Sequence, residues 1–281
     1  TPEDTFVTFC FPIRGADSVT TTTENPWNYN AYETLIRPDW KTGELVPCLA
    51  TEWGYDEEGN FHITLRDDVI FHDGTKLDSD DVMFTLERCA TNPASRVASA
   101  MKKIDFEKSY VIDDTHLVIV FSEPSGAFVN YLSSGYCGIM SKEFCEKNGE
   151  DCDFLSDDAG SGAYRLVETV TGSSQTFERF DQWWGGTPEI KTVVAKSIMD
   201  KNAMFIDYEN GDLDLAMQNT FDSISRVMRG EVTDSVLNNL LLNRGMYLAL
   251  ASCGDGPLSD IRIRQALAAC IDYDELILGV F

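Results

Sequence analysis

The chain has 281 residues, enough for one large domain or two ordinary domains with a substantial core. Its 47 acidic and 22 basic residues give a formal net charge of −25, which argues against nucleic acid or an anionic lipid surface as a partner, since both need clustered Lys and Arg. The composition is that of a soluble globular protein with an acidic, well-solvated surface. The sequence contains no run of about 18 apolar residues, so it predicts no membrane-spanning helix.

The N-terminal part of the chain predicts a strand and then an irregular connection. Val7, Phe9 and Phe11 alternate with Thr8 and Cys10, the period-two pattern of a half-buried strand. The following residues, up to the first prolines and tryptophan, are polar and Thr-rich, so we expect a loop. The segment Y-E-T-L beyond them opens a helix or a strand.

A strand, a turn and a helix follow one another without a break in the next segment. Residues 61–65 alternate apolar and polar side chains, as a half-buried strand does. Asp73-Gly74 predicts a turn, because glycine accepts positive φ and aspartate bonds its own backbone. Asp78 or Ser79 then offers an oxygen to the free N–H groups of a helix that we expect to reach about Ala90.

Later segments indicate two more strands and a capped helix. Residues 111–121 predict a turn and a strong strand, and residues 190–198 predict another strand. Asp200 offers a cap for a helix that stops at Asn210-Gly211, a usual pairing at a helix C-terminus.

The C-terminal part predicts a strand at residues 248–251 and an amphipathic helix after Pro257. The apolar stripe of that helix consists of Ile263, Ala266, Leu267, Cys270 and Ile271.

Two glycines and two tryptophans allow both a functional and a structural interpretation. Gly160 and Gly162 resemble a phosphate loop, but no helix follows them and the sequence runs straight into a strand. Trp183 and Trp184 suit ligand stacking, but a packed corner whose indoles anchor a turn is commoner. The structural interpretation is favoured for both.

Enzymatic chemistry has little support. Asp212 and Asp214 lie two residues apart and would share one face of a strand, as an acid/base pair requires, but solvated acids at a strand entry are much commoner. The chain has no G-x-S-x-G motif and no Cys/His signature of a nucleophile. We expect no catalytic residue.

The eight cysteines leave two interpretations open: disulfides of an exported protein, or buried free thiols. None forms a C-x-x-C pair and the three histidines are scattered, so we expect no metal site and no cofactor. We expect one disulfide among Cys137, Cys145 and Cys152, and a free thiol at Cys270. The remaining cysteines are Cys10, Cys48, Cys89 and Cys253.

The order of several separate motifs resembles one known family. The matching blocks are Y-E-x-L at residues 32–35, G-x-x-x-P-x-L-A-x-x-W at 43–53, V-x-F-H-D-G at 69–74, D-D-V-x-F at 80–84, G-S-G-A-Y-R-L at 160–166, W-W-G-G-x-P at 183–188, G-D-L-D-L at 211–215 and P-L-x-D-x-R-x-R-Q-A-L at 257–267. Ala163 and Trp183 replace the usual proline and tyrosine. Together the blocks resemble the family 5 extracellular solute-binding proteins, the receptors of peptide and nickel ABC importers. Full members are considerably longer, so the chain looks like a C-terminally truncated member.

The resemblance implies an α/β fold with mixed sheets, the two-lobed periplasmic binding protein fold (type II, cluster C-like), of which this chain would hold the first lobe and the start of the second. Domain I would combine residues 1–30 and 158–246, domain II would be an insertion at residues 31–157, and domain III would begin at residues 247–281.

The resemblance also implies a binding function, in which two hinged lobes close on a peptide that is then delivered to the ABC transporter permease subunits. By position, the family's ligand contacts fall on Thr21, Thr22, Thr23, Tyr29, Met217, Gln218, Asn219 and Tyr247. The implied location is extracytoplasmic: the chain starts at Thr1 without a signal peptide, so we expect that an export segment has been removed. A lipid anchor on the removed N-terminus would be the only link to a membrane, and we expect a monomer.

Three alternatives remain. A receptor of the same family could bind nickel or another small solute, although the sparse histidines weakly disfavour direct metal ligation. A secreted hydrolase is a second alternative, and a sensory domain that uses the same fold is a third. We also expect that these 281 residues alone do not bind ligand measurably, because half a cleft leaves the other face of the ligand in water.

Overall fold

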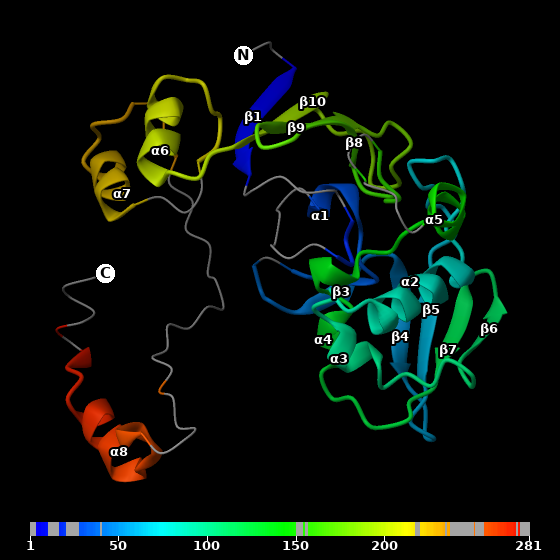
Figure 1. The fold of residues 1–281 in the computed structure, drawn as a ribbon. Coiled ribbons are helices and arrows are strands. Elements are labelled where there is room, and N and C mark those ends of the chain that lie inside the picture. The colour runs from blue at the N-terminus through cyan, green and yellow to red at the C-terminus, as the bar shows by residue number, and fades with distance from the viewer. Residues whose placement is uncertain are drawn as a thin grey trace. The chain divides into compact units, whose positions relative to one another are not determined.

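The computed structural model describes residues 4–10, 17–20, 28–39, 41–149, 154, 157–216, 220–233, 235–236, 250, 256–273 and 275. The chain divides into two compact units, Thr1–Gln218 and Asn219–Phe281. Among the described residues, all of the strands belong to the first unit, and the second unit consists of helices and connections (Figure 1).

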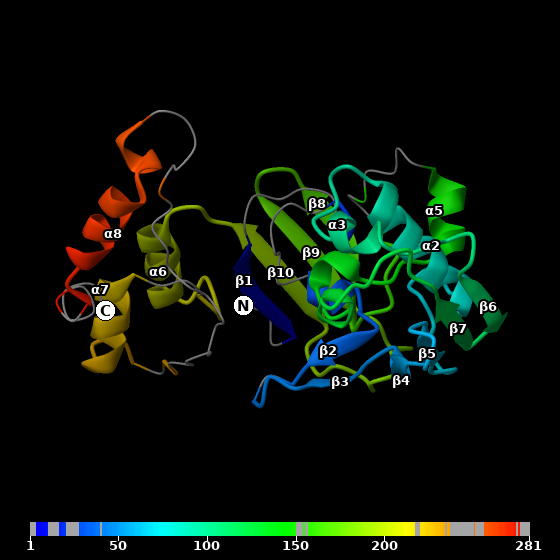
Figure 2. The same cartoon turned by 90° about the horizontal axis from the view of Figure 1, so that it is seen from below.

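Sheet A joins the N-terminal strand to strands from much later in the chain, and the four lie side by side in Figure 2. Its order is β1 (Thr5–Cys10), β10 (Thr192–Ser197), β9 (Ser174–Arg179) and β8 (Tyr164–Val170). β1 runs parallel to β10, whereas the other neighbours are antiparallel. Leu166, Phe177 and Val193 are buried on this sheet. β1 confirms the strand predicted from the alternation that begins at Val7, and β10 confirms the strand predicted at residues 190–198.

Sheet C is entirely antiparallel and is built from a continuous part of the chain. Its order is β4 (Ala50–Tyr55), β5 (Phe61–Leu65), β7 (His116–Ile119) and β6 (Tyr110–Asp113). Phe61, Ile63 and Leu65 of β5 are buried, as the alternation predicts. The predicted turn and strand at residues 111–121 form the β6–β7 hairpin.

Helices cover sheet C and complete the first unit. They are α2 (Ser79–Thr91), α3 (Ala98–Met101), α4 (Phe128–Tyr131), the 3-10 helix η1 (Gly135–Cys137) and α5 (Lys142–Asn148). α6 (Lys201–Glu209) follows β10 and begins at Asp200, which accepts hydrogen bonds from the N–H groups of Asn202 and Ala203. The predicted helix start at Asp200 is therefore confirmed.

The N-terminus of α2 is closed by a reciprocal cap. Of the two candidates the cap is Asp78, whose Oδ1 accepts hydrogen bonds from the N–H groups of Asp80 (2.8 Å) and Asp81 (3.2 Å). Asp81 Oδ2 accepts the N–H of Asp78 in return, at 3.0 Å. Ser79 is instead the first helical residue. The helix reaches Thr91, one residue past the predicted end.

Replacing Asp78 with alanine removes the acceptor for two N–H groups of α2. We expect the free energy of unfolding to fall by about 1 kcal/mol, the usual cost of losing an N-cap side chain. Urea unfolding followed by circular dichroism measures this. Asp67→Ala is the control, because Asp67 is an exposed aspartate outside any helix. Equal losses in the two variants would contradict the capping role.

The segment predicted to be a helix or strand at Tyr32–Leu35 is neither, and this prediction is wrong. Helix α1 (Asn28–Ala31) ends before it, and strand β2 (Ile36–Pro38) starts after it and pairs with β3 (Leu45–Pro47) as sheet B. The physical reason is that Glu33 and Thr34 use their side chains in loop contacts. Regular structure would turn these side chains away from their partners.

Glu33 organises the double-tryptophan corner. Its carboxylate accepts hydrogen bonds from the indole N–H of Trp183 (3.1 Å) and of Trp184 (2.7 Å), and from the hydroxyl of Ser161 (3.1 Å). The Arg66 guanidinium lies over the Trp184 ring, 3.4 Å from its centroid. Burial raises the pKa of Glu33, although these hydrogen bonds act in the opposite direction. The predicted packed corner is confirmed.

The connection into β8 is fixed by a buried charged pair and two close-packed glycines. His72 donates from Nδ1 to Asp158 (2.6 Å) and from Nε2 to the carbonyl of Gly162 (2.9 Å). A Cβ on Gly160 would lie 2.8 Å from the carbonyl carbon of Ala31, so these glycines permit close approach to α1. They have a packing role, in agreement with the favoured interpretation.

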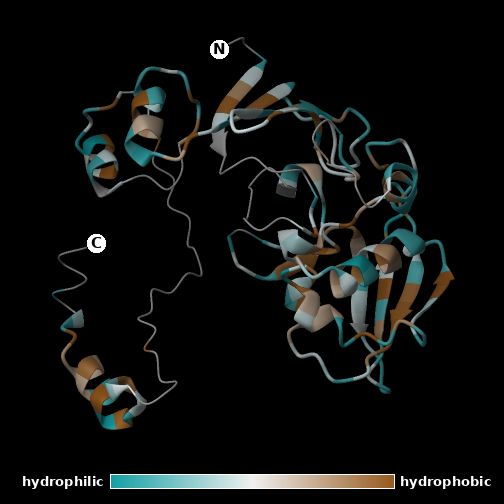
Figure 3. Cartoon of the chain, in the orientation of Figure 1, coloured by the Kyte–Doolittle hydropathy of each residue, from teal (hydrophilic) through white to brown (hydrophobic). Residues whose placement is uncertain are grey.

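The second unit contains the predicted C-terminal helix. α7 (Phe221–Met228) comes first, and η2 (Pro257–Ser259) leads into α8 (Ile261–Ala269). Figure 3 shows hydrophobic residues on α8, and both Ile263 and Leu267 are about 40% exposed (39% and 41%). The strand predicted at residues 248–251 lies outside the described residues, apart from Leu250.

The thiols only partly match the predictions. Cys270 is free and exposed, which confirms the expectation for that residue. Cys137 is a free, buried thiol, so it takes no part in the predicted disulfide. Cys152, the third member of that set, lies outside the described residues. The division into domains I, II and III stays a prediction.

Candidate functional site at the carboxyl edge of sheet A

Three chain segments end together at one edge of sheet A. β1 is parallel to β10 on one side, and on the other side Thr8 forms a parallel bridge with Leu215. The N–H of Asp214 donates to the carbonyl of Val7 (2.8 Å), and Asp214 Oδ2 accepts the N–H of Val7 (2.7 Å). Because parallel strands present their carboxyl ends at the same edge, Cys10, Ser197 and Leu215 lie towards one edge of the sheet.

This edge is the candidate binding site on topological grounds. Open α/β sheets bind ligands outside the carboxyl ends of their strands, at points where neighbouring connections diverge. The predicted contacts Thr21, Thr22 and Thr23 follow β1, and the predicted contacts at residues 217–219 follow the Leu215 bridge. Both groups lie outside the described residues, so their place at this edge stays a prediction.

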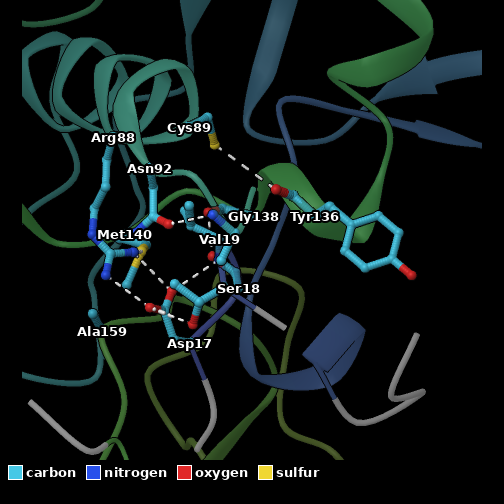
Figure 4. Close-up of polar contacts among 12 residues, drawn as sticks. Asp17, Ser18, Val19, Arg88, Cys89, Asn92, Tyr136, Gly138, Met140 and Ala159 are labelled. Carbon is cyan, nitrogen blue, oxygen red and sulfur yellow. Dashed lines mark hydrogen bonds and ion pairs between the residues drawn. The ribbon is translucent and has the colours of Figure 1, made fainter. Parts of the chain in front are cut away.

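An ion pair fixes the segment that precedes the threonines (Figure 4). Arg88 in the last turn of α2 donates from its two terminal nitrogens to the carboxylate of Asp17, at 2.8 and 2.7 Å. Asp17 also accepts the N–H of Val19 and the hydroxyl of Thr20, both at 2.9 Å. Burial acts to raise the pKa of Asp17, but Arg88 outweighs it and the pKa lies below its usual value. Residues 17–20 thus form a turn held in place by the Asp17 carboxylate, called the tied turn below.

A second contact ties the same turn to the segment after η1. The Ser18 hydroxyl donates to the carbonyl of Gly138 at 3.0 Å, deep in the structure. No local pattern predicts these roles of Asp17 and Ser18, because their partners lie 71 and 120 residues further along the chain. These residues hold the loop that would contact ligand.

Tyr29 is the one predicted site residue that the structure describes. Its side chain is partly exposed, and its hydroxyl accepts the N–H of Gly135 at 3.1 Å. A Cβ on Gly135 would lie 2.7 Å from the Tyr29 ring, so the ring packs directly on that glycine. The other predicted residues lie outside the described part of the chain and stay predictions: Thr21, Thr22, Thr23, Met217, Gln218, Asn219 and Tyr247.

A cavity of about 810 Å³ lies elsewhere, beside the C-terminal ends of α2 and α5. Its described lining includes Phe84, Glu87, Arg88, Asn92 and Glu146. Tyr29, the one predicted ligand contact that the structure describes, is not among these lining residues.

Asp214, one of the two acids considered for catalysis, has a structural contact. Asp214 accepts a backbone hydrogen bond from β1, which ties its carboxylate to the sheet. In the described part of the chain, no group of three or more His, Cys, Asp or Glu side chains is arranged to hold a metal ion. In the same residues, no helix is long and apolar enough to cross a membrane.

Comparison with known proteins identifies the family. The family model described as bacterial extracellular solute-binding proteins, family 5 Middle, matches residues 44–281. The dipeptide-binding protein of Escherichia coli (strain K12) is 26% identical over 273 residues, which cover 89% of this chain and 50% of that protein. The glutathione-binding protein GsiB of Pectobacterium atrosepticum is 26% identical over 245 residues, 86% of this chain and 46% of that one. The chain thus spans about half the length of the curated relatives it matches.

A solved structure shows the same fold. The crystal structure of NikZ from Campylobacter jejuni in complex with Ni(L-His) has a TM-score of 0.77 and 23% identity, and covers 99% of this chain and 55% of that one. It confirms the predicted α/β, two-lobed periplasmic binding protein fold with mixed sheets, of which this chain covers part. Since the family model spans most of the sequence, the chain belongs to the family 5 bacterial extracellular solute-binding proteins.

Proposed function

We propose that the chain is part of the receptor of an ABC importer, which captures a peptide between two hinged lobes and delivers it to the membrane permease. The observation that carries the proposal is the family match over residues 44–281. The convergence of β1 and the Leu215 bridge at one edge of sheet A supports it, because open α/β sheets bind ligands at the carboxyl ends of their strands.

The proposed mechanism is capture by closure, with no bond made or broken. The peptide would be bound through main-chain hydrogen bonds at the carboxyl edge of sheet A, and such bonds accept many peptide sequences. The Asp17–Arg88 pair keeps the root of the first loop in place, so that less ordering is needed when ligand binds. Hinge closure over the ligand then produces the form that the permease recognises.

The domain limits and the location belong to the proposal. Domain I comprises residues 1–30 and 158–246, domain II residues 31–157, and domain III begins at residues 247–281. The mature receptor is an extracytoplasmic monomer, held at the membrane by a lipid anchor or released.

A metal complex is the second candidate ligand. The observation that favours it is the likeness to NikZ, whose structure contains Ni(L-His). A peptide is preferred because the two sequence relatives described above bind a dipeptide and glutathione.

The test is a thermal melt of the full-length protein with pools of di- to pentapeptides, and separately with nickel and histidine. A ligand at about 100 times its Kd adds about 2.7 kcal/mol to the stability of the folded state, so we expect peptides to raise the midpoint by several degrees. Nickel with excess EDTA controls for contaminating metal. A shift with nickel alone would replace the peptide with a metal complex as the ligand, and no shift with either would overturn the receptor proposal.

The 281-residue chain is the matched control for this experiment. We expect no shift with the same peptides, because its relatives are about twice as long and one face of the ligand would stay in water. Micromolar affinity for the 281 residues alone would contradict a site shared between two lobes.

A further inference from the structure

Two buried thiols from different elements lie in contact beside the tied turn. Cys89 is in the last turn of α2 and Cys137 ends η1, and both are free and fully buried. The Cys89 thiol donates to the carbonyl oxygen of Tyr136 at 3.8 Å (Figure 4). That carbonyl belongs to the peptide bond that joins Tyr136 to Cys137. Cys137 is also the neighbouring group that interacts most strongly with the Cys89 thiol.

We propose that Cys89 and Cys137 are oxidised to a disulfide that crosslinks α2 to η1. The oxidant is a disulfide, either small, such as oxidised glutathione, or on a dithiol oxidoreductase. One cysteine thiolate attacks it, forms a mixed disulfide and releases one thiol. The second cysteine thiolate then attacks the mixed disulfide, forms the Cys89–Cys137 bond and releases the second thiol, so that two electrons and two protons pass to the oxidant.

The bond forms before folding is complete. The neighbouring Cys137 thiol, followed by burial, raises the pKa of the Cys89 thiol well above its usual value. The reactive thiolate is therefore suppressed in the folded chain, and burial blocks access to the oxidant. The reduced protein, once folded, keeps both thiols unreactive.

The crosslink would secure contacts on both sides of Cys137. On one side, the N–H of Gly135 donates to the Tyr29 hydroxyl. On the other, the carbonyl of Gly138 accepts from Ser18. A bond from α2 to η1 therefore braces the segment that supports the turn at residues 17–20 and the ring of Tyr29.

The experiment is to refold the reduced, urea-unfolded chain with a mixture of reduced and oxidised glutathione, and in parallel with reduced glutathione alone. Unreacted thiols are alkylated in denaturant and the protein is digested and analysed by mass spectrometry. We expect one crosslinked peptide pair, containing Cys89 and Cys137, only in the oxidised sample. A loop of roughly 50 residues is closed, so the oxidised form should melt higher by about 5 °C or more.

Three variants make the assignment specific. Cys89→Ala and Cys137→Ala should each abolish the difference in melting temperature between the two samples. Cys48→Ala should keep it, because Cys48 is another buried free thiol, with a pKa that burial raises to about 12. If a variant fails to refold, the wild-type digest still decides. Recovery of alkylated Cys89 and Cys137 from the oxidised sample, or of either cysteine joined to another one, would overturn the proposal.

Discussion

Replacing Asp158 with alanine should lower the free energy of unfolding by about 4 kcal/mol, because removing one partner of a buried ion pair leaves the other uncompensated. Asp158 and His72 both have fully buried side chains. Asp158 Oδ1 accepts from His72 and from the N–H of Gly160 (2.8 Å), and Oδ2 accepts the N–H of Leu166 (2.7 Å). Alanine satisfies none of these donors.

The loss should depend on pH in a defined direction. Both ring nitrogens of His72 face acceptors, so the imidazolium form fits the site. Burial acts to lower the pKa of His72, but Asp158 outweighs it and the pKa is raised. A raised pKa contributes stability that is complete below the unfolded value of about 6.5 and is lost as the pH rises through the folded value. The advantage of the wild type over Asp158→Ala should therefore be larger at about pH 6 than at about pH 9.

Urea unfolding at the two pH values measures both effects. Asp157→Ala is the matched control, since Asp157 is the exposed neighbour of Asp158, and its side chain accepts the N–H of Asp158 without a hydrogen bond to the His72 ring, whose partners are Asp158 and Gly162. We expect it to cost less than about 1 kcal/mol. An equal loss in both variants, or a loss in Asp158→Ala that is the same at both pH values, would contradict the buried imidazolium.

Gly162→Ala should cost about 3 kcal/mol or more, because it forces a methyl group against backbone that cannot rotate away. The new Cβ would lie 2.7 Å from the carbonyl carbon of Asn30 and 2.8 Å from that of Ala31. Either α1 or the connection into β8 has to move. Movement of the connection would also lengthen the bond from His72 Nε2 to the Gly162 carbonyl.

Thermal melts of Gly162→Ala and Gly126→Ala provide the comparison. Gly126 has open space where a Cβ would lie and does not have a positive φ, so alanine there should change stability by less than about 0.5 kcal/mol. Gly162 and Asp158 both contact His72. In the variant that carries both Gly162→Ala and Asp158→Ala, the free energy of unfolding should therefore fall by less than the sum of the two single losses. Full additivity would show that the two act independently.

The sequence predicted what depends on near neighbours in the chain. The alternation at residues 61–65, the cap at Asp78 and the cap at Asp200 all appeared where the local patterns placed them. The tryptophan corner was also predicted, but its partner Glu33 lies 150 residues earlier, beyond the reach of any local pattern. The failure at Tyr32–Leu35 has the same cause, since Glu33 is held by that distant contact.

The residues of the candidate site could not be identified from their own chemistry or spacing. The threonines after β1 and residues 217–219 were selected by resemblance alone, since nothing in their chemistry distinguishes them from ordinary loop residues. The parallel bridge between Thr8 and Leu215 explains why two such distant segments can serve one site. The disulfide expected among Cys137, Cys145 and Cys152 is not formed by Cys137 in this structure, and its other members leave it a prediction, because spacing along the chain says little about which thiols meet in space.

The position of β1 also has a consequence for how the chain assembles during synthesis. Its partners on both sides come from residues 192–197 and 213–215, so the pairing of Val7 with Asp214 spans 207 residues. Sheet C finds all of its strands within residues 50–119 and can close first. Contacts of such high sequence separation form slowly, since a long loop must close before they are gained. Of the strands in sheets A and C, β1 is thus the first to be synthesised and among the last to be paired, and an unpaired β1 is a segment of the nascent chain that a chaperone would need to shield.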